Sequence, residues 1–143
     1  MKENLLESAK KLNQPPLEYS EEFNQKKDKL ASELSRRMSS REDIEKLVGK
    51  GNIGMMEDNS RNLSRFMGSL FLNYNPEVFV ETMLWVFKSY RAHGFQLAFW
   101  SANVDTYAEI MKEELSPEAY KYLYPFFEWI IVNIPLFSKL TDK

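Results

Sequence analysis

The chain has 143 residues, no cysteine, one histidine and a formal net charge of −2. Its length suits one domain with an ordinary hydrophobic core, and the lack of cysteine excludes disulfides, thiol catalysis and cysteine-based metal sites. The balanced charge gives no general attraction to nucleic acid, and no apolar run is long enough for a signal peptide or a membrane span. We therefore expect a cytoplasmic protein that neither binds nucleic acid nor spans a membrane.

The N-terminal segment is separated from the rest by Asn13-Gln14-Pro15-Pro16, because paired prolines remove backbone donors and disfavour a helical residue before them. Residues 1–19 are therefore predicted to form an arm or a short helix, and residues 20–143 a helical domain. A thin apolar stripe among many charges predicts a surface helix over about residues 20–38. Residues 44–48 follow as a short helix, and the glycines of residues 49–54 predict a loop. A phosphate-binding loop is disfavoured there because the full motif is absent.

Helical spacing of apolar residues predicts another helix from Glu57 to about Asn73. The next helix has the clearest start, with Asn75 as N-cap, Pro76 in the first position and Glu77 in the first turn. It ends at Gly94, and a further helix is predicted over about residues 95–115. No segment shows sustained period-two alternation, so the chain is predicted to be all-α, a single globin-like bundle of about six helices.

Ser116-Pro117-Glu118 begins the last predicted helix, in which Pro125 should cause a bend and Pro135 should end or kink the helix. One face of this helix forms a full core stripe that includes Tyr122. The other face carries Tyr120, Tyr124 and Trp129. A helix that is apolar on two faces has two partners. These three residues are therefore the predicted interface of a homodimer.

The order of residues in the central part of the chain carries a family resemblance. It consists of an acidic pair and apolar positions in one helix, then a proline-led helix with a tryptophan and a final glycine: Glu57-Asp58, Asn62-Leu63, Phe66, Leu70, Pro76, Phe79, Trp85, Arg91 and Gly94. Over roughly residues 40–135, this order resembles the non-haem globin domains of stressosome sensor proteins and the helical domains that precede cobalamin-binding modules in bacterial regulators. It is more remotely similar to phycobiliproteins. The resemblance implies a globin-like fold, usually homodimeric, that acts as a signal-input module.

Two positions depart from the pattern of these families. Asn62 stands where the helical domains commonly have histidine. Tyr90 stands four residues before Gly94, where haem-binding sensor globins tend to place the proximal histidine. The resemblance therefore implies that the usual iron ligand is absent.

These observations predict a non-enzymatic sensory or regulatory domain that signals through a homodimer to a separate downstream protein, with no resident cofactor. Its aromatic interior is a candidate pocket for an apolar small molecule, and ordinary core packing is the competing interpretation. The candidate pocket residues are Phe66, Trp85, Tyr90, Trp100, Tyr107 and Phe127. The alternative is a haem- or tetrapyrrole-binding globin-type sensor that uses Tyr90 or His93 as iron ligand, since both residue types are known axial ligands.

Charged clusters offer weaker alternatives. Glu109, Glu113, Glu114 and Glu118 surround a helix junction, but the EF-hand spacing is absent, so a solvated acidic face is expected rather than a metal site or a catalytic carboxylate pair. Basic residues between about 26 and 41 alternate with acidic ones, which cancels the charge that phosphate binding requires. With one histidine and no thiol, no nucleophile–base pair can be assembled, and we expect no catalysis.

Overall fold

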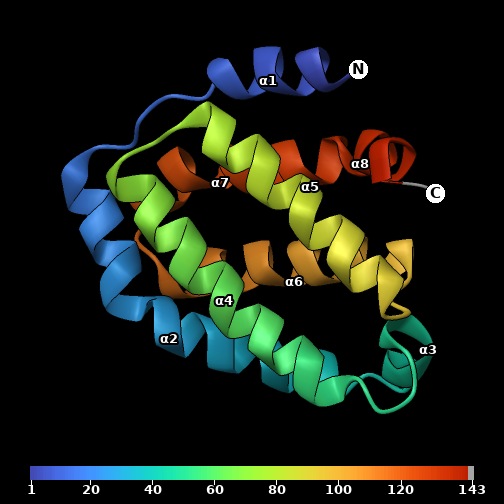
Figure 1. The fold of residues 1–143 in the computed structure, drawn as a ribbon. Coiled ribbons are helices and arrows are strands. Elements are labelled where there is room, and N and C mark those ends of the chain that lie inside the picture. Colours follow the sequence, from blue (N-terminus) through green and yellow to red (C-terminus); the bar gives the residue numbers. More distant parts are fainter. Residues whose placement is uncertain (142–143) are drawn as a thin grey trace.

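The computed structural model describes residues 1–141, and every regular element in that range is an α-helix (Figure 1). The helices are α1 (Lys2–Lys10), α2 (Leu17–Ser39), α3 (Ile44–Val48), α4 (Ile53–Leu72), α5 (Pro76–Ala92), α6 (Leu97–Glu114), α7 (Pro117–Val132) and α8 (Ile134–Thr141). The all-α prediction is confirmed, but the expected number of about six helices is wrong for the described residues, which form eight. The difference arises because the N-terminal segment is helical and because the last predicted helix is divided at Asn133.

Local sequence signals account for where several helices begin and end. The Asn75 side chain accepts a hydrogen bond of 3.1 Å from the backbone N–H of Val78, and the Ser116 hydroxyl accepts one of 3.2 Å from the N–H of Ala119. Gly94 has a φ of +105°, a conformation that other residues rarely adopt, and it follows the end of α5. These predicted starts and the predicted stop are confirmed. The surface helix α2 begins a few residues earlier than expected, directly after Pro16.

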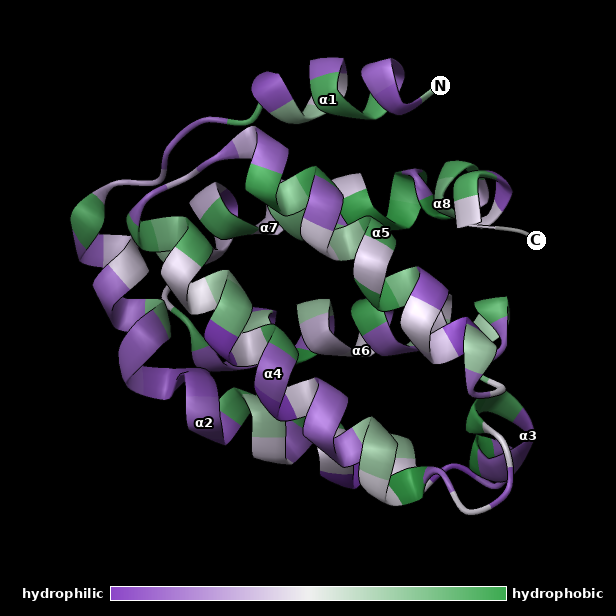
Figure 2. Cartoon of the chain, in the orientation of Figure 1, coloured by the Kyte–Doolittle hydropathy of each residue, from purple (hydrophilic) through white to green (hydrophobic). Residues whose placement is uncertain are grey.

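The core combines aliphatic side chains from the whole chain with aromatic side chains, most of which come from its second half. The helix α2 packs against α4, α6 and α7, while α5 packs against α1 and α8. At the centre, the ring of Phe71 contacts Phe23 from α2 and both Phe126 and Phe127 from α7. Hydrophilic residues dominate α2, whereas α8 is mostly hydrophobic (Figure 2). No helix within residues 1–141 is long and apolar enough to cross a membrane.

The first helix is docked on the bundle. Leu5 and Ala9 are buried, and the indole Nε1 of Trp129 donates a hydrogen bond of 2.8 Å to the Ser8 hydroxyl. The linker is also held, because the Gln14 amide donates to the carbonyl of Phe71 at 2.6 Å. As a result, α1 covers part of α5 and α7 (Figure 1).

The helices α4 and α6 run in the same direction and are in register, which matters for the site. Both begin at the α3 end of the molecule (Figure 1). There the Asn52 amide donates a hydrogen bond of 2.8 Å to the carbonyl of His93, 41 residues further along the chain. Further on, the hydroxyls of Ser64 and Tyr107, which are 43 residues apart, form a buried hydrogen bond. Ser64 of α4 therefore lies opposite Tyr107 of α6.

Candidate ligand-binding cavity

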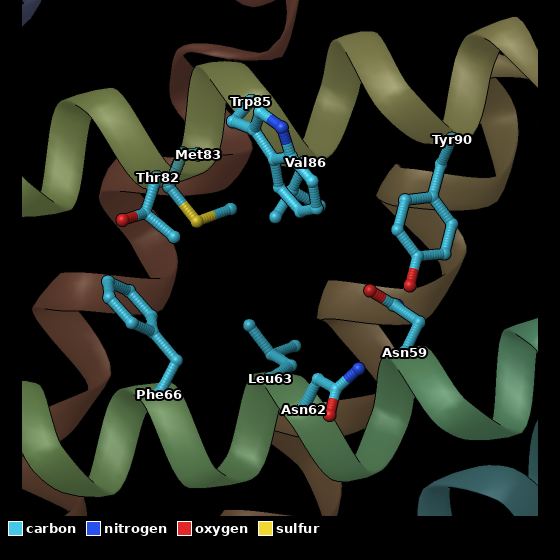
Figure 3. A pocket seen from close by; sticks show the side chains of 9 residues that line it. All are labelled: Asn59, Asn62, Leu63, Phe66, Thr82, Met83, Trp85, Val86 and Tyr90. Atoms are coloured by element: carbon cyan, nitrogen blue, oxygen red, sulfur yellow. The ribbon is translucent and has the colours of Figure 1, made fainter.

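A cavity of about 240 Å³ lies between α4 and α5. Figure 3 shows the two helices on opposite sides of it, with the side chains of both directed into the space between them. The lining residues are Asn59, Asn62, Leu63 and Phe66 from α4 and Thr82, Met83, Trp85, Val86 and Tyr90 from α5.

The cavity follows from how α4 and α5 are arranged. They are joined by the short turn 73–75, yet they are not among the helix pairs that pack closely. Each presents one face at helical spacing to the other, and the side chains between them leave part of the space open. Trp85 lies at the rim and is 65% exposed. The result is a mostly apolar cavity that is partly open to solvent.

One end of the cavity is polar. The Asn59 side chain lines it although this residue is only 3% exposed, and its Nδ2 has no hydrogen-bond partner among the described residues. The Tyr90 hydroxyl points from α5 toward the amides of Asn59 and Asn62 (Figure 3). Buried amide donors in native proteins are almost always paired. The Asn59 nitrogen is enclosed by the protein, and the oxygen of this amide is the atom directed into the cavity beside the Tyr90 hydroxyl (Figure 3).

Tyr90 is a neutral group at this polar end. Burial raises the pKa of its hydroxyl above the ordinary value, and the negative charge of Asp58 acts in the same direction. A hydrogen bond with Asn62 opposes the rise but does not cancel it. Tyr90 therefore remains protonated at neutral pH and offers a hydroxyl rather than a phenolate to the cavity.

The predicted pocket residues fall into two groups. Phe66, Trp85 and Tyr90 line the cavity together. In contrast, Trp100 stacks on Phe87 with ring centroids 4.6 Å apart. Tyr107 and Phe127 also lie in the core, where their ring centroids are 5.1 Å apart. The six residues therefore do not line one common pocket.

Of the two candidate iron ligands, only Tyr90 faces the cavity. His93 is exposed at the end of α5, and its Nδ1 lies 2.9 Å from the carbonyl oxygen of Ser89. The cavity volume of about 240 Å³ is below the range of about 300–1,000 Å³ that is typical of pockets for drug-sized ligands. The haem alternative therefore has one candidate ligand at this cavity and stays a prediction.

The predicted dimer-interface residues are also divided. Tyr120 and Tyr124 are stacked on the surface of α7 with ring centroids 5.3 Å apart. Trp129 is only 6% exposed, because α1 covers the face of α7 on which it lies. Its predicted position outside the core is therefore wrong, and so is the placement of Tyr122 in the core stripe, since Tyr122 is 44% exposed. Tyr122 instead stacks on Tyr19 of α2.

Asn59 and Thr82 were missed by the sequence analysis. Polar residues in the middle of a helix usually indicate its solvent face. Asn59, however, precedes Leu63 by four residues and Phe66 by seven, which places it on the same face as the apolar stripe. That spacing is the signal that could have identified Asn59.

Several charged residues outside the cavity form ion pairs. Glu113 pairs with Arg37 at 2.6 Å and Glu114 with Lys29 at 2.8 Å. Hydrogen bonds from Arg36 and then Arg37 lower the pKa of Glu33 to about 2. Within residues 1–141, no three acidic, histidine or cysteine side chains come together as a potential metal site.

Comparisons of this chain with models of protein families, with curated proteins and with solved structures find no match. The resemblance to globin-like sensor domains therefore stays a prediction, and the function is argued from the cavity itself.

Proposed function

We propose that this chain is a non-enzymatic sensory or regulatory domain that binds a small, mainly apolar molecule between α4 and α5. The observation that carries the proposal is the combination of a mostly apolar, partly open cavity with the polar side chains of Asn59, Asn62 and Tyr90 gathered at one end (Figure 3). Binding sites for small molecules are typically concave and mostly apolar, with a few polar groups that orient the ligand. The cavity volume of about 240 Å³ suits a compact ligand.

The proposed signal is a change in the position of α5. A ligand favours whichever helix arrangement it binds more tightly, and one between α4 and α5 acts directly on their separation. Because α5 packs against α1 and α8, and α8 packs against α7, a shift of α5 can be passed to the α7 surface. There the stacked pair Tyr120 and Tyr124 is the proposed contact with a second copy of the chain. A separate downstream protein would respond to the change in that dimer.

Binding can be tested with isopropylbenzene as an apolar probe. We expect saturable shifts of the methyl NMR signals of Leu63 and Val86, because both side chains line the cavity. In a Val86→Phe variant, the larger ring should fill the space and weaken binding by at least about tenfold, the effect of losing about 1.4 kcal/mol of contact energy. The matched control is Val132→Phe, which makes the same change on the exposed surface of α7 and should leave binding unaltered.

The proposal fails if isopropylbenzene causes no saturable shift in the parent chain. It also fails if Val86→Phe binds the probe as tightly as Val132→Phe does. Circular dichroism of each variant establishes that the helices are retained, so a loss of binding can be assigned to the cavity.

A further inference from the structure

The polar end of the cavity presents both a hydrogen-bond donor and an acceptor to the open space. The Tyr90 hydroxyl reaches in from α5, and the side-chain oxygen of Asn59 on α4 lies beside it (Figure 3). Tyr90 also hydrogen bonds with Asn62, and this bond lowers the pKa of the hydroxyl, as expected when the amide donates to the phenolic oxygen. The proton of Tyr90 is therefore left to donate, while the Asn59 oxygen can only accept.

The charges at this end disfavour an anionic ligand. None of the side chains that line the cavity within residues 1–141 is charged. The carboxylate of Asp58 raises the pKa of the Tyr90 hydroxyl, so its negative charge acts on this end although Asp58 also pairs with Arg61. A ligand carboxylate would face this charge and the Asn59 oxygen with no cation in the lining to balance it. The polar group of the ligand is therefore expected to be neutral.

The rest of the cavity limits the size of the ligand. An apolar cavity of about 150 Å³ accommodates benzene, so a volume of about 240 Å³ suits a single ring with a short substituent. The apolar part of the lining comes from both helices and includes Leu63, Phe66, Met83 and Val86.

We infer that the ligand is a compact alcohol or phenol, whose hydroxyl accepts a hydrogen bond from Tyr90 and donates one to the side-chain oxygen of Asn59. This inference rests on the proposed function and names the polar group of the molecule bound there. A hydroxyl serves both partners because it has one proton and two lone pairs. A ketone has no proton for the Asn59 oxygen, and a hydrocarbon pairs with neither group.

A matched set of probes tests the hydroxyl. Isopropylbenzene, acetophenone, 1-phenylethanol and benzoate have the same number of non-hydrogen atoms, but they carry no polar group, a carbonyl, a hydroxyl and a carboxylate, respectively. Their affinities are measured from the methyl NMR signals of Leu63 and Val86. Ratios of affinities are compared between variants, because this cancels the difference in hydration of the probes.

Tyr90→Phe should reduce the affinity for 1-phenylethanol relative to isopropylbenzene by about three- to tenfold, the effect of one neutral hydrogen bond. Asn59→Leu should reduce the affinity for 1-phenylethanol relative to acetophenone by a similar factor, because it removes an acceptor that only the alcohol uses. Benzoate should bind the parent chain more weakly than 1-phenylethanol does.

The matched controls are Tyr122→Phe and Asn4→Leu, which make the same exchanges at exposed positions and should leave both ratios unchanged. If isopropylbenzene does not bind the parent chain, the proposed function itself fails. If it binds, an unchanged ratio in either variant that is folded by circular dichroism overturns the hydroxyl and leaves the apolar site standing. Tighter binding of benzoate than of 1-phenylethanol does the same. Because Tyr90 and Asn59 lie on different helices, one variant remains informative if the other fails to fold.

Discussion

Buried polar side chains in this protein differ in whether they have a hydrogen-bond partner. Ser64 and Tyr107 hydrogen bond to each other across α4 and α6, whereas the amide of Asn103, one turn before Tyr107, has no partner among residues 1–141. Burial raises the pKa of the Tyr107 hydroxyl, and the hydrogen bond with Ser64 opposes that rise only in part. Tyr107 is therefore neutral over the whole physiological pH range and acts as a structural polar group.

The Ser64–Tyr107 pair should behave as a coupled unit. Tyr107→Phe and Ser64→Ala should each reduce the free energy of unfolding by about 1–2 kcal/mol, because each leaves a buried hydroxyl without its partner. The double variant leaves neither hydroxyl, so its loss should be smaller than the sum of the two by at least about 0.5 kcal/mol. Urea denaturation followed by circular dichroism measures all three values. Strictly additive losses would show that the two hydroxyls do not depend on each other.

At the scale of helices, α5 and α7 both begin with a side-chain N-cap, but only the cap of α7 also bonds to another helix. Asn75 caps α5 through the N–H of Val78, and the contact stays within the helix start. Ser116 caps α7 and is also bound by Glu22 of α2, which accepts from the Ser116 backbone N–H at 2.6 Å and from its hydroxyl at 2.8 Å. The second cap therefore links two helices that are far apart in the sequence.

Removing each cap should show how much of its stabilising effect is local to the helix and how much comes from the contact with Glu22. Asn75→Ala should destabilise the protein by about 1 kcal/mol, the typical value of an N-cap. Ser116→Ala should cost more, because it also removes a hydrogen bond to a carboxylate. Asn75→Asp serves as control, since aspartate caps as well as asparagine does. Thermal and urea unfolding measure how much free energy of unfolding each variant loses. Equal losses for the two alanine variants would contradict a stabilising role of Glu22.

At the scale of the whole molecule, α7 has faces in three different surroundings. One of its faces packs in the core through Phe126 and Phe127, and α1 covers the face with Trp129. The stacked Tyr120 and Tyr124 are half-buried, so part of each ring remains at the surface. That arrangement narrows the proposed dimer contact from the three predicted residues to this tyrosine pair.

Sedimentation velocity at about 10–100 μM, where weak association becomes measurable, tests the dimer. We expect the parent chain to sediment as a dimer and Tyr124→Glu to sediment as a monomer, because a charge buried without a partner in an interface is costly. The matched control is Tyr122→Glu, which changes a tyrosine on the same helix that stacks on Tyr19 instead. A parent chain that is monomeric throughout this range, or a dimer that both variants leave intact, would rule out the tyrosine pair as the contact.

Part of the candidate site was predictable from the sequence. Phe66, Trp85 and Tyr90 were identified from their helical spacing, and they do line one cavity. Trp100, Tyr107 and Phe127 show the same spacing but lie in the core. The helical spacing of apolar residues indicates which residues share an apolar face, but it does not indicate how far the opposite helix lies from that face.

The sequence by itself determined the helical class and the places where α5 and α7 begin, because a cap acts between residues no more than four positions apart. Only the tertiary structure decided that Trp129 is buried while Trp85 is exposed, and that Asn59 faces a cavity. The reason is that burial depends on which segment is nearby in space. For Trp129 that segment is α1, more than a hundred residues away in the chain, and for Asn59 it is an α5 helix that stands apart from α4.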